Sequence, residues 1–122
     1  MNFEQTNEFK KELKKLQKKW RSLPQDIVAA ELQISALYSD DVDAAEYRAA
    51  FFNGKRATIL QVLENGTEVV KMRLDVESLG TSSKLRVVFI AIVTTNSVLL
   101  VELYAKNDKE NLDKSRIKKY LR

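Results

Sequence analysis

Residues 69–76 (VVKMRLDV) decide the fold prediction, because apolar and charged residues alternate along them. Side chains of a β-strand point alternately to the two faces of a sheet. One predicted face is apolar and consists of Val70, Met72, Leu74 and Val76. The other face is charged and consists of Lys71, Arg73 and Asp75. The first set predicts a core face, whereas the second places two cations on a face that needs another explanation.

The segments around this stretch predict an antiparallel sheet. Residues 56–63 and 68–76 flank Asn65-Gly66, and Asn-Gly between two strands is a strong hairpin signal. Residues 85–93 are apolar on both faces, which is typical of a central strand covered on both sides. Residues 98–105 continue the sheet after a turn.

Helices are predicted before and after these strands in the sequence. An apolar stripe at helical spacing follows the candidate N-cap Thr6 and comprises Phe9, Leu13, Leu16 and Trp20. Ser22-Leu23-Pro24 ends this helix and begins a second one. The second stripe comprises Ile27, Ala30, Ile34 and Leu37. Residues 38–53 are ambiguous, and a last helix begins at Asp108 or Asn111.

These patterns predict a single α+β domain over residues 1–122. An N-terminal helical hairpin packs on a four-stranded antiparallel sheet, and a short C-terminal helix follows. Residues 2–6 are the candidate for a fifth strand at the edge.

The composition excludes several kinds of chemistry. The chain contains neither Cys nor His, which excludes disulfides, thiolate zinc sites and histidine-dependent nucleophiles. The acidic run at residues 40–43 lacks the spacing and the turn glycine of a calcium loop. We therefore expect no metal and no cofactor. The sequence also lacks a signal-peptide pattern and a long apolar span, so we expect a cytoplasmic protein without membrane contact.

Positive charge is concentrated in two segments of this chain, whose net charge is +4. Residues 10–21 hold seven basic residues and one acid, and residues 114–122 hold five basic residues and no acid. This distribution suggests an anionic partner such as nucleic acid. For any one such helix, the alternative is a solvated lysine-rich face.

Cations on different predicted strands could share one surface. Arg86 opens the central strand, and Lys106 follows the last strand with the same parity as Tyr104. Together with Lys71 and Arg73 these cations could form a phosphate site, since Arg offers a planar fork and Lys a point charge. The alternative is a solvent-exposed face of an antiparallel sheet that carries charged residues without binding phosphate.

Four motifs, in order, resemble the RelE/HigB-type toxins of bacterial type II toxin–antitoxin systems, within the RelE/ParE superfamily. They are FKKELKKL at 9–16, VVKMRL at 69–74, RVVF at 86–89 and YAKNDKENL at 104–112. The resemblance implies a RelE-like fold and a metal-independent endoribonuclease that cleaves mRNA, often in the decoding site of the ribosome. It also implies a cognate antitoxin as a partner.

The resemblance further implies roles for particular residues. Lys71 and Arg73 would face the phosphate, Arg86 would be the central cation, and Lys106 and Lys109 would lie at the rim. Further RNA-binding candidates are Lys84, Lys14 and Lys18.

The chemistry can be argued from RNA itself, whose 2′-hydroxyl can attack the adjacent phosphate without a protein nucleophile. Fixed cations would stabilise the transition state, and general acid–base groups would move protons. Lys71 is a candidate base if neighbouring cations depress its pKa. Tyr104 is a candidate acid or base-stacking residue, and the alternative for it is packing.

Two features depart from the family pattern. Tyr120 is the candidate for an acid–base residue in the last helix, but its apolar neighbours indicate packing. The loop at 79–85 is less glycine-rich than is usual. Two other functions therefore remain open: a ParE-like inhibitor of DNA gyrase, and a non-toxic nucleic-acid-binding protein of the same fold.

Overall fold

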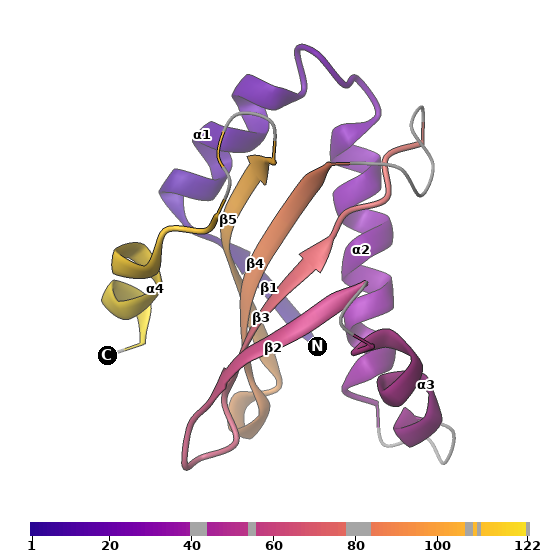
Figure 1. Ribbon diagram of the computed structural model, residues 1–122, viewed down its shortest axis with the longest axis vertical. Helices are drawn as coiled ribbons and strands as arrows, with labels where there is room; N and C mark the ends of the chain where they lie inside the picture. The colour runs from indigo at the N-terminus through magenta and orange to yellow at the C-terminus, as the bar shows by residue number, and fades with distance from the viewer. Residues whose placement is uncertain (40–43, 54–55, 78–83, 107–108, 110, 122) are drawn as a thin grey trace.

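The computed structural model describes residues 1–39, 44–53, 56–77, 84–106, 109 and 111–121. The acidic run at 40–43, most of the predicted loop at 78–84 and Asp108 lie outside these residues. The elements follow one another as β1 (Asn2–Gln5), α1 (Asn7–Leu16), α2 (Leu23–Leu37), α3 (Ala44–Phe51), β2 (Ala57–Val62), β3 (Glu68–Arg73), β4 (Leu85–Ile92), the 3₁₀ turn η1 (Val93–Thr95), β5 (Ser97–Ala105) and α4 (Lys114–Tyr120) (Figure 1). The chain therefore has an α+β fold.

The sheet has five strands in the order β1-β5-β4-β3-β2. Strands β2 to β5 form the predicted antiparallel meander. The prediction of an antiparallel-only sheet is wrong, because β1 pairs with β5 in parallel. This pairing is fixed by long-range contacts such as that of the Thr6 N–H with the Leu100 carbonyl at 3.1 Å, which a four-residue strand does not reveal in its own sequence.

Helix boundaries follow from local capping. The Thr6 side chain accepts a hydrogen bond from the Phe9 N–H at 3.1 Å, as an N-cap does. Helix α1 ends at Leu16, before Trp20, so the predicted stripe extends beyond the helix, although Trp20 still packs against the core. Helix α4 begins later than predicted, because Asp113 supplies its N-cap and accepts a hydrogen bond from the Arg116 N–H at 3.1 Å.

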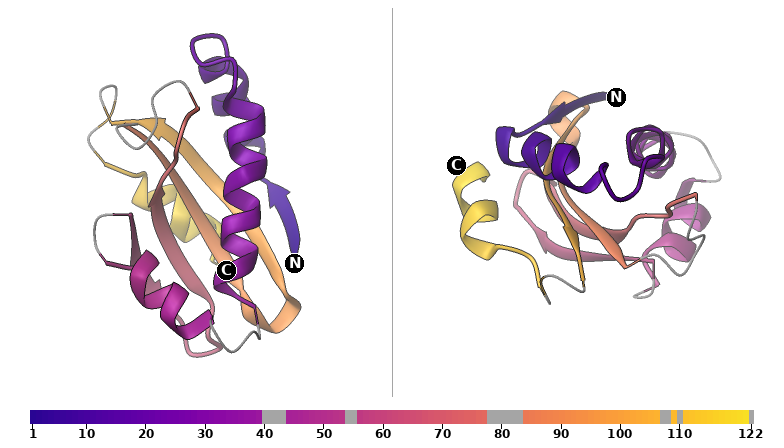
Figure 2. Two further views of the ribbon diagram at one scale, coloured as in Figure 1. Left: turned by 90° about the vertical axis from the view of Figure 1, so that its right-hand side faces the viewer. Right: turned by 90° about the horizontal axis from the view of Figure 1, so that it is seen from above.

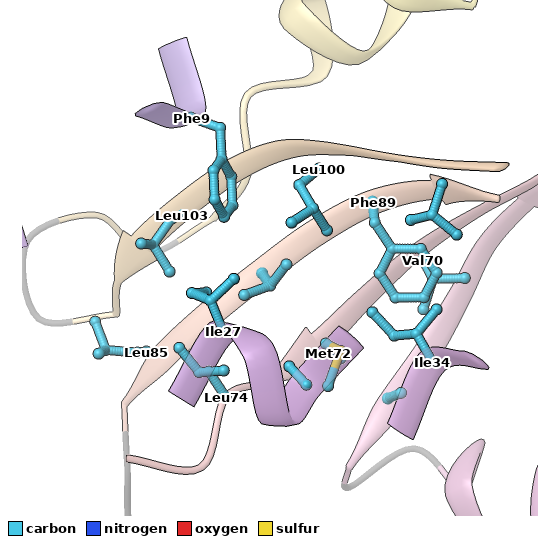
Figure 3. Packing of buried hydrophobic residues seen from close by; sticks show 14 of the residues in the cluster. Phe9, Ile27, Ile34, Val70, Met72, Leu74, Leu85, Phe89, Leu100 and Leu103 are labelled. Atoms are coloured by element: carbon cyan, nitrogen blue, oxygen red, sulfur yellow. The ribbon is translucent and has the colours of Figure 1, made fainter. Parts of the chain in front are cut away.

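The larger hydrophobic core lies between the sheet and the layer of α1 and α2, which lie together on one side of it (Figure 2). Phe9 of α1 and Ile27 and Ile34 of α2 point toward the strands (Figure 3). The predicted apolar face of residues 69–76 is fully buried in this core: Val70, Met72, Leu74 and Val76. The alternation in that stretch therefore identified the core face correctly.

A second, smaller core lies on the opposite face of the sheet. Ile117 of α4 packs there against residues that include Val69, Val88 and Ile90. Strand β4 is thus covered on both faces, as its two-sided apolar sequence predicted. None of the described helices is long and apolar enough to span a membrane.

Candidate functional site

A small polar hollow of about 160 Å³ opens on the α4-side face of the sheet, where Lys71 and Arg73 of β3 point. We call it the cationic pocket. Its described lining residues are Arg56, Ala57, Thr58, Lys71, Met72, Arg73, Arg86 and Lys106. The structure therefore brings together Lys71, Arg73, Arg86 and Lys106, which the sequence proposed as one group, and it adds Arg56.

Strand register explains why these side chains meet. Arg73 of β3 lies directly opposite Arg86 of β4. Lys71 lies opposite Thr58 of β2, and the Arg73 N–H donates to the Arg56 carbonyl at 2.8 Å. The Lys106 N–H donates to the Lys84 carbonyl at 2.8 Å and so keeps the end of β5 beside β4.

The pocket concentrates positive charge at an energetic cost. Like charges directly opposite each other in adjacent strands are destabilising, and Arg73 and Arg86 are such a pair. One carboxylate partly offsets this: Asp75 Oδ2 lies 2.8 Å from Arg56 Nη2, and Asp75 Oδ1 lies 3.7 Å from Arg73 Nε. A local conflict of this kind is typical of a functional site rather than of a site optimised for stability.

Two buried atoms at the pocket have no hydrogen-bond partner within the described part of the chain. They are Arg73 Nε and Asp75 Oδ1, whose separation of 3.7 Å is too long for a hydrogen bond. An unsatisfied buried polar atom costs about 1–3 kcal/mol. The fold therefore retains a local energetic cost at the contact of Arg73 with Asp75 beside the pocket.

Tyr104 is placed differently from the other proposed catalytic residues. It is buried in the smaller core and lines a separate hollow, together with Glu12 and Lys109, rather than the cationic pocket. Burial, and then the charge of Glu102, raise the pKa of the Tyr104 hydroxyl, so it stays protonated. Tyr104 nevertheless pairs with Arg86 across β4 and β5, and the charge of that arginine acts on its pKa in the opposite direction, so Tyr104 lies beside the cations although it does not line their pocket.

Lys109 also lies away from the cationic pocket. Its ammonium group pairs with Glu102, a carboxylate with no exposed surface, and lies 5.4 Å from the centre of the Tyr104 ring. The Asp113 N–H donates to the same carboxylate at 2.8 Å. Lys109 thus neutralises a buried charge, which a sequence pattern of basic residues does not distinguish from RNA binding.

The remaining predicted RNA-binding lysines do not line the pocket. Lys84 is exposed immediately before β4. Lys14 and Lys18 are exposed on and just after α1, which packs on the opposite side of the sheet. The structure does not bring these two α1-side lysines to the cations of β3 and β4.

Sequence reasoning did not identify Arg56 as a site residue and assigned no role to Asp75. Arg56 and Thr58 are two residues apart in the predicted strand, so their side chains point to the same face of the sheet. This spacing could have identified Arg56 as a candidate. Its contact with Asp75 depends on the pairing of β2 with β3, which shifts register between Ile59 and Gln61. No cluster of three carboxylates suited to a metal ion occurs among the residues that the structure describes.

Comparison with known protein families, curated protein sequences and solved structures gives no match to this chain. The geometry of the cationic pocket and the motifs of the sequence therefore carry the functional argument.

Proposed function

We propose that this chain is a RelE/HigB-type toxin: a metal-independent endoribonuclease that cleaves mRNA with the help of the ribosome and is silenced by an antitoxin. The observation that carries the proposal is the meeting of five cations around one hollow: three from β3 and β4, one just before β2 and one just after β5. Arg56, Arg73 and Arg86 offer planar donors that match phosphate oxygens.

The motifs support the same assignment. VVKMRL forms most of β3, RVVF lies in β4, and the Tyr-Ala-Lys at the start of the last motif closes β5. Four of the five cations in the pocket lie in these three motifs: Lys71, Arg73, Arg86 and Lys106. The resemblance and the geometry therefore point to one surface.

The proposed reaction uses the RNA's own nucleophile. The 2′-oxygen forms a bond to the adjacent phosphorus, the bond to the 5′-oxygen breaks, and a 2′,3′-cyclic phosphate and a 5′-hydroxyl result. Fixed arginine donors stabilise the extra negative charge of the phosphorane, and one such donor typically contributes about 10²- to 10³-fold in rate.

Proton transfer falls to the two lysines of the pocket, because arginine does not release its proton in proteins. Neither Lys71 nor Lys106 forms an ion pair with any described carboxylate. In this proposal one of the two lysines takes the 2′ proton and the other gives a proton to the departing 5′-oxygen.

Controlled expression in bacterial cells tests this proposal. The wild-type chain is expected to stop growth and protein synthesis, and Arg86→Ala and Lys71→Ala are expected to relieve the arrest while remaining folded. Lys11→Ala, which removes the same charge from α1, is expected to stay toxic. Induction of DNA damage with translation intact would instead indicate a gyrase inhibitor. Full toxicity of both folded pocket variants would refute the assignment.

A further inference from the structure

A larger groove of about 450 Å³ adjoins the cationic pocket. It runs between α4 and the strands of the β2–β3 hairpin, and Lys71 lines both hollows. We call it the α4 groove. Its volume lies within the range of ordinary small-ligand sites, roughly 300–1,000 Å³.

The α4 groove combines an apolar floor with a cationic rim. Val69 of β3 and Ile117 of α4 are buried and contribute to the floor. Lys114 and Lys118 lie on exposed positions of α4, with Lys71 at the junction. All charged residues in the described lining are therefore lysines, which favours an anionic ligand with an apolar part.

We propose that the α4 groove holds the nucleotide next to the cleaved linkage, with its base on the apolar floor and its phosphate between Lys114 and Lys118. This inference rests on the proposed function. It assigns to α4 a second substrate site that shares Lys71 with the cationic pocket and adds Lys114 and Lys118.

Two features favour a nucleotide over an acidic amphipathic peptide. Lys71 makes the groove continuous with the proposed phosphate site, so a single RNA strand can occupy both. Gln61 and Asn111 also line the groove, and their amides carry both donors and acceptors that can meet the edge of a base. Because the described lining contains no aromatic residue, the base would be held by burial against aliphatic side chains instead of by stacking.

The experiment is an NMR titration of the full chain with a short 2′-O-methyl oligoribonucleotide, which cannot attack its own phosphate. Backbone signals of Lys71, Arg73 and Arg86 are expected to shift together with those of Gln61, Lys114 and Ile117. Lys118→Ala is expected to weaken binding and to reduce the slope of log K against log salt by about 0.7, the value for one phosphate contact on a single strand. Lys11→Ala is the matched control and should leave the slope unchanged.

Each outcome separates this inference from the proposed function. Shifts confined to the cationic pocket would overturn the inference and leave the proposed function standing. Shifts in neither hollow would also overturn the inference, whereas the proposed function, which involves the ribosome, is judged separately by the expression experiment. Shifts around the α4 groove with an acidic amphipathic peptide, but not with the oligonucleotide, would make the groove a protein-docking site and would also overturn the inference.

Discussion

At the scale of single residues, Asp75 determines how two arginines of the cationic pocket are held. Its carboxylate lies 2.8 Å from Arg56 Nη2 and 3.7 Å from Arg73 Nε. Asp75 is therefore a positioning residue. Its negative charge opposes phosphate binding, whereas its contacts orient two of the donors that a phosphorane would need.

We predict that Asp75→Asn separates binding from cleavage. Affinity for a 2′-O-methyl oligonucleotide should stay the same or increase, because one negative charge is lost. The cleavage rate of the matching RNA should fall, because Arg56 and Arg73 lose their common partner. Glu64→Gln removes the same charge from an exposed position in the hairpin turn and should change neither quantity. Equal effects of Asp75→Asn on binding and on rate would contradict a positioning role.

A second prediction concerns the buried carboxylate of Glu102. Glu102 has no exposed surface whereas its partner Lys109 is partly exposed, so Lys109→Ala leaves a buried charge without its partner and should lower the free energy of unfolding by about 1–3 kcal/mol. Adding Glu102→Gln should recover at least half of this loss, because a neutral amide can still accept from the Asp113 N–H. Urea unfolding measures both values. A double variant no more stable than Lys109→Ala would show that charge burial is not the cause.

Part of this residue-level detail could be predicted from the sequence. Strict alternation places Lys71 and Arg73 on the face opposite the larger core, whereas the position of Arg86 beside them depends on the register of β3 with β4, which the sequence left open. The assignments of Lys109 and Tyr104 could not be predicted, because they depend on a buried acid in β5. That strand carries a β-bulge, in which Val88 pairs with Glu102 but Phe89 pairs with Leu100, so simple alternation does not apply there.

At the scale of elements, α4 is attached to α1 largely through polar contacts. Arg116 Nη1 lies 2.8 Å from Glu12 Oε1 and donates to the Val101 carbonyl at 3.1 Å. The Tyr120 hydroxyl donates to Glu8, and Lys119 Nζ lies 3.2 Å from the same carboxylate. Since α4 forms one wall of the α4 groove, two acids of α1 help to set its position.

This attachment predicts a pH dependence. The hydrogen bond from Tyr120, then the backbone N–H of Glu8 and the ammonium group of Lys119, lower the pKa of Glu8 from 4.5 to about 2. The unfolded chain therefore binds this proton at a higher pH than the folded chain. The stabilisation is present above about pH 4.5 and is lost as the pH falls toward 2.

Tyr120→Phe removes the largest cause of this shift. Its thermal unfolding midpoint should therefore change less than that of the wild type between pH 4.5 and pH 2. Tyr47→Phe, at an exposed position of α3, serves as the control and should follow the wild-type curve. Identical curves for wild type and Tyr120→Phe would show that the Glu8 contact does not stabilise the fold.

The elements themselves differ in how well the sequence predicts them. The hairpin at Asn65-Gly66 is found as predicted, with Gly66 at a φ of 83°, a conformation that L side chains rarely adopt. The direction of β1 and the start of α4 could not be predicted, because a parallel edge pairing and a cap at Asp113 leave little periodic signal. Residues 38–53, which were ambiguous, contain α3, held in part by the ion pair of Arg48 with Glu68 at 3.0 Å.

At the scale of the whole molecule, the positive charge is divided between the two sides of the sheet. The apolar residues of α1 pack in the larger core, and its Lys15 lines a hollow beside Tyr104 and Lys109, whereas the cationic pocket and α4 lie on the side of the smaller core. The net charge therefore says little about where RNA would bind. The pocket is set by strand register, which brings together cations that are 50 residues apart in the sequence, as Arg56 and Lys106 are.

The most direct test of the account is to map the products formed when the purified chain acts on mRNA, with and without ribosomes. The account predicts fragments that end in 2′,3′-cyclic phosphate and begin with a 5′-hydroxyl. It also predicts a loss of rate of about 10²- to 10³-fold in Arg86→Ala and no loss in Lys11→Ala. Intact RNA under both conditions, or equal cleavage by the wild type and a folded Arg86→Ala variant, would contradict it.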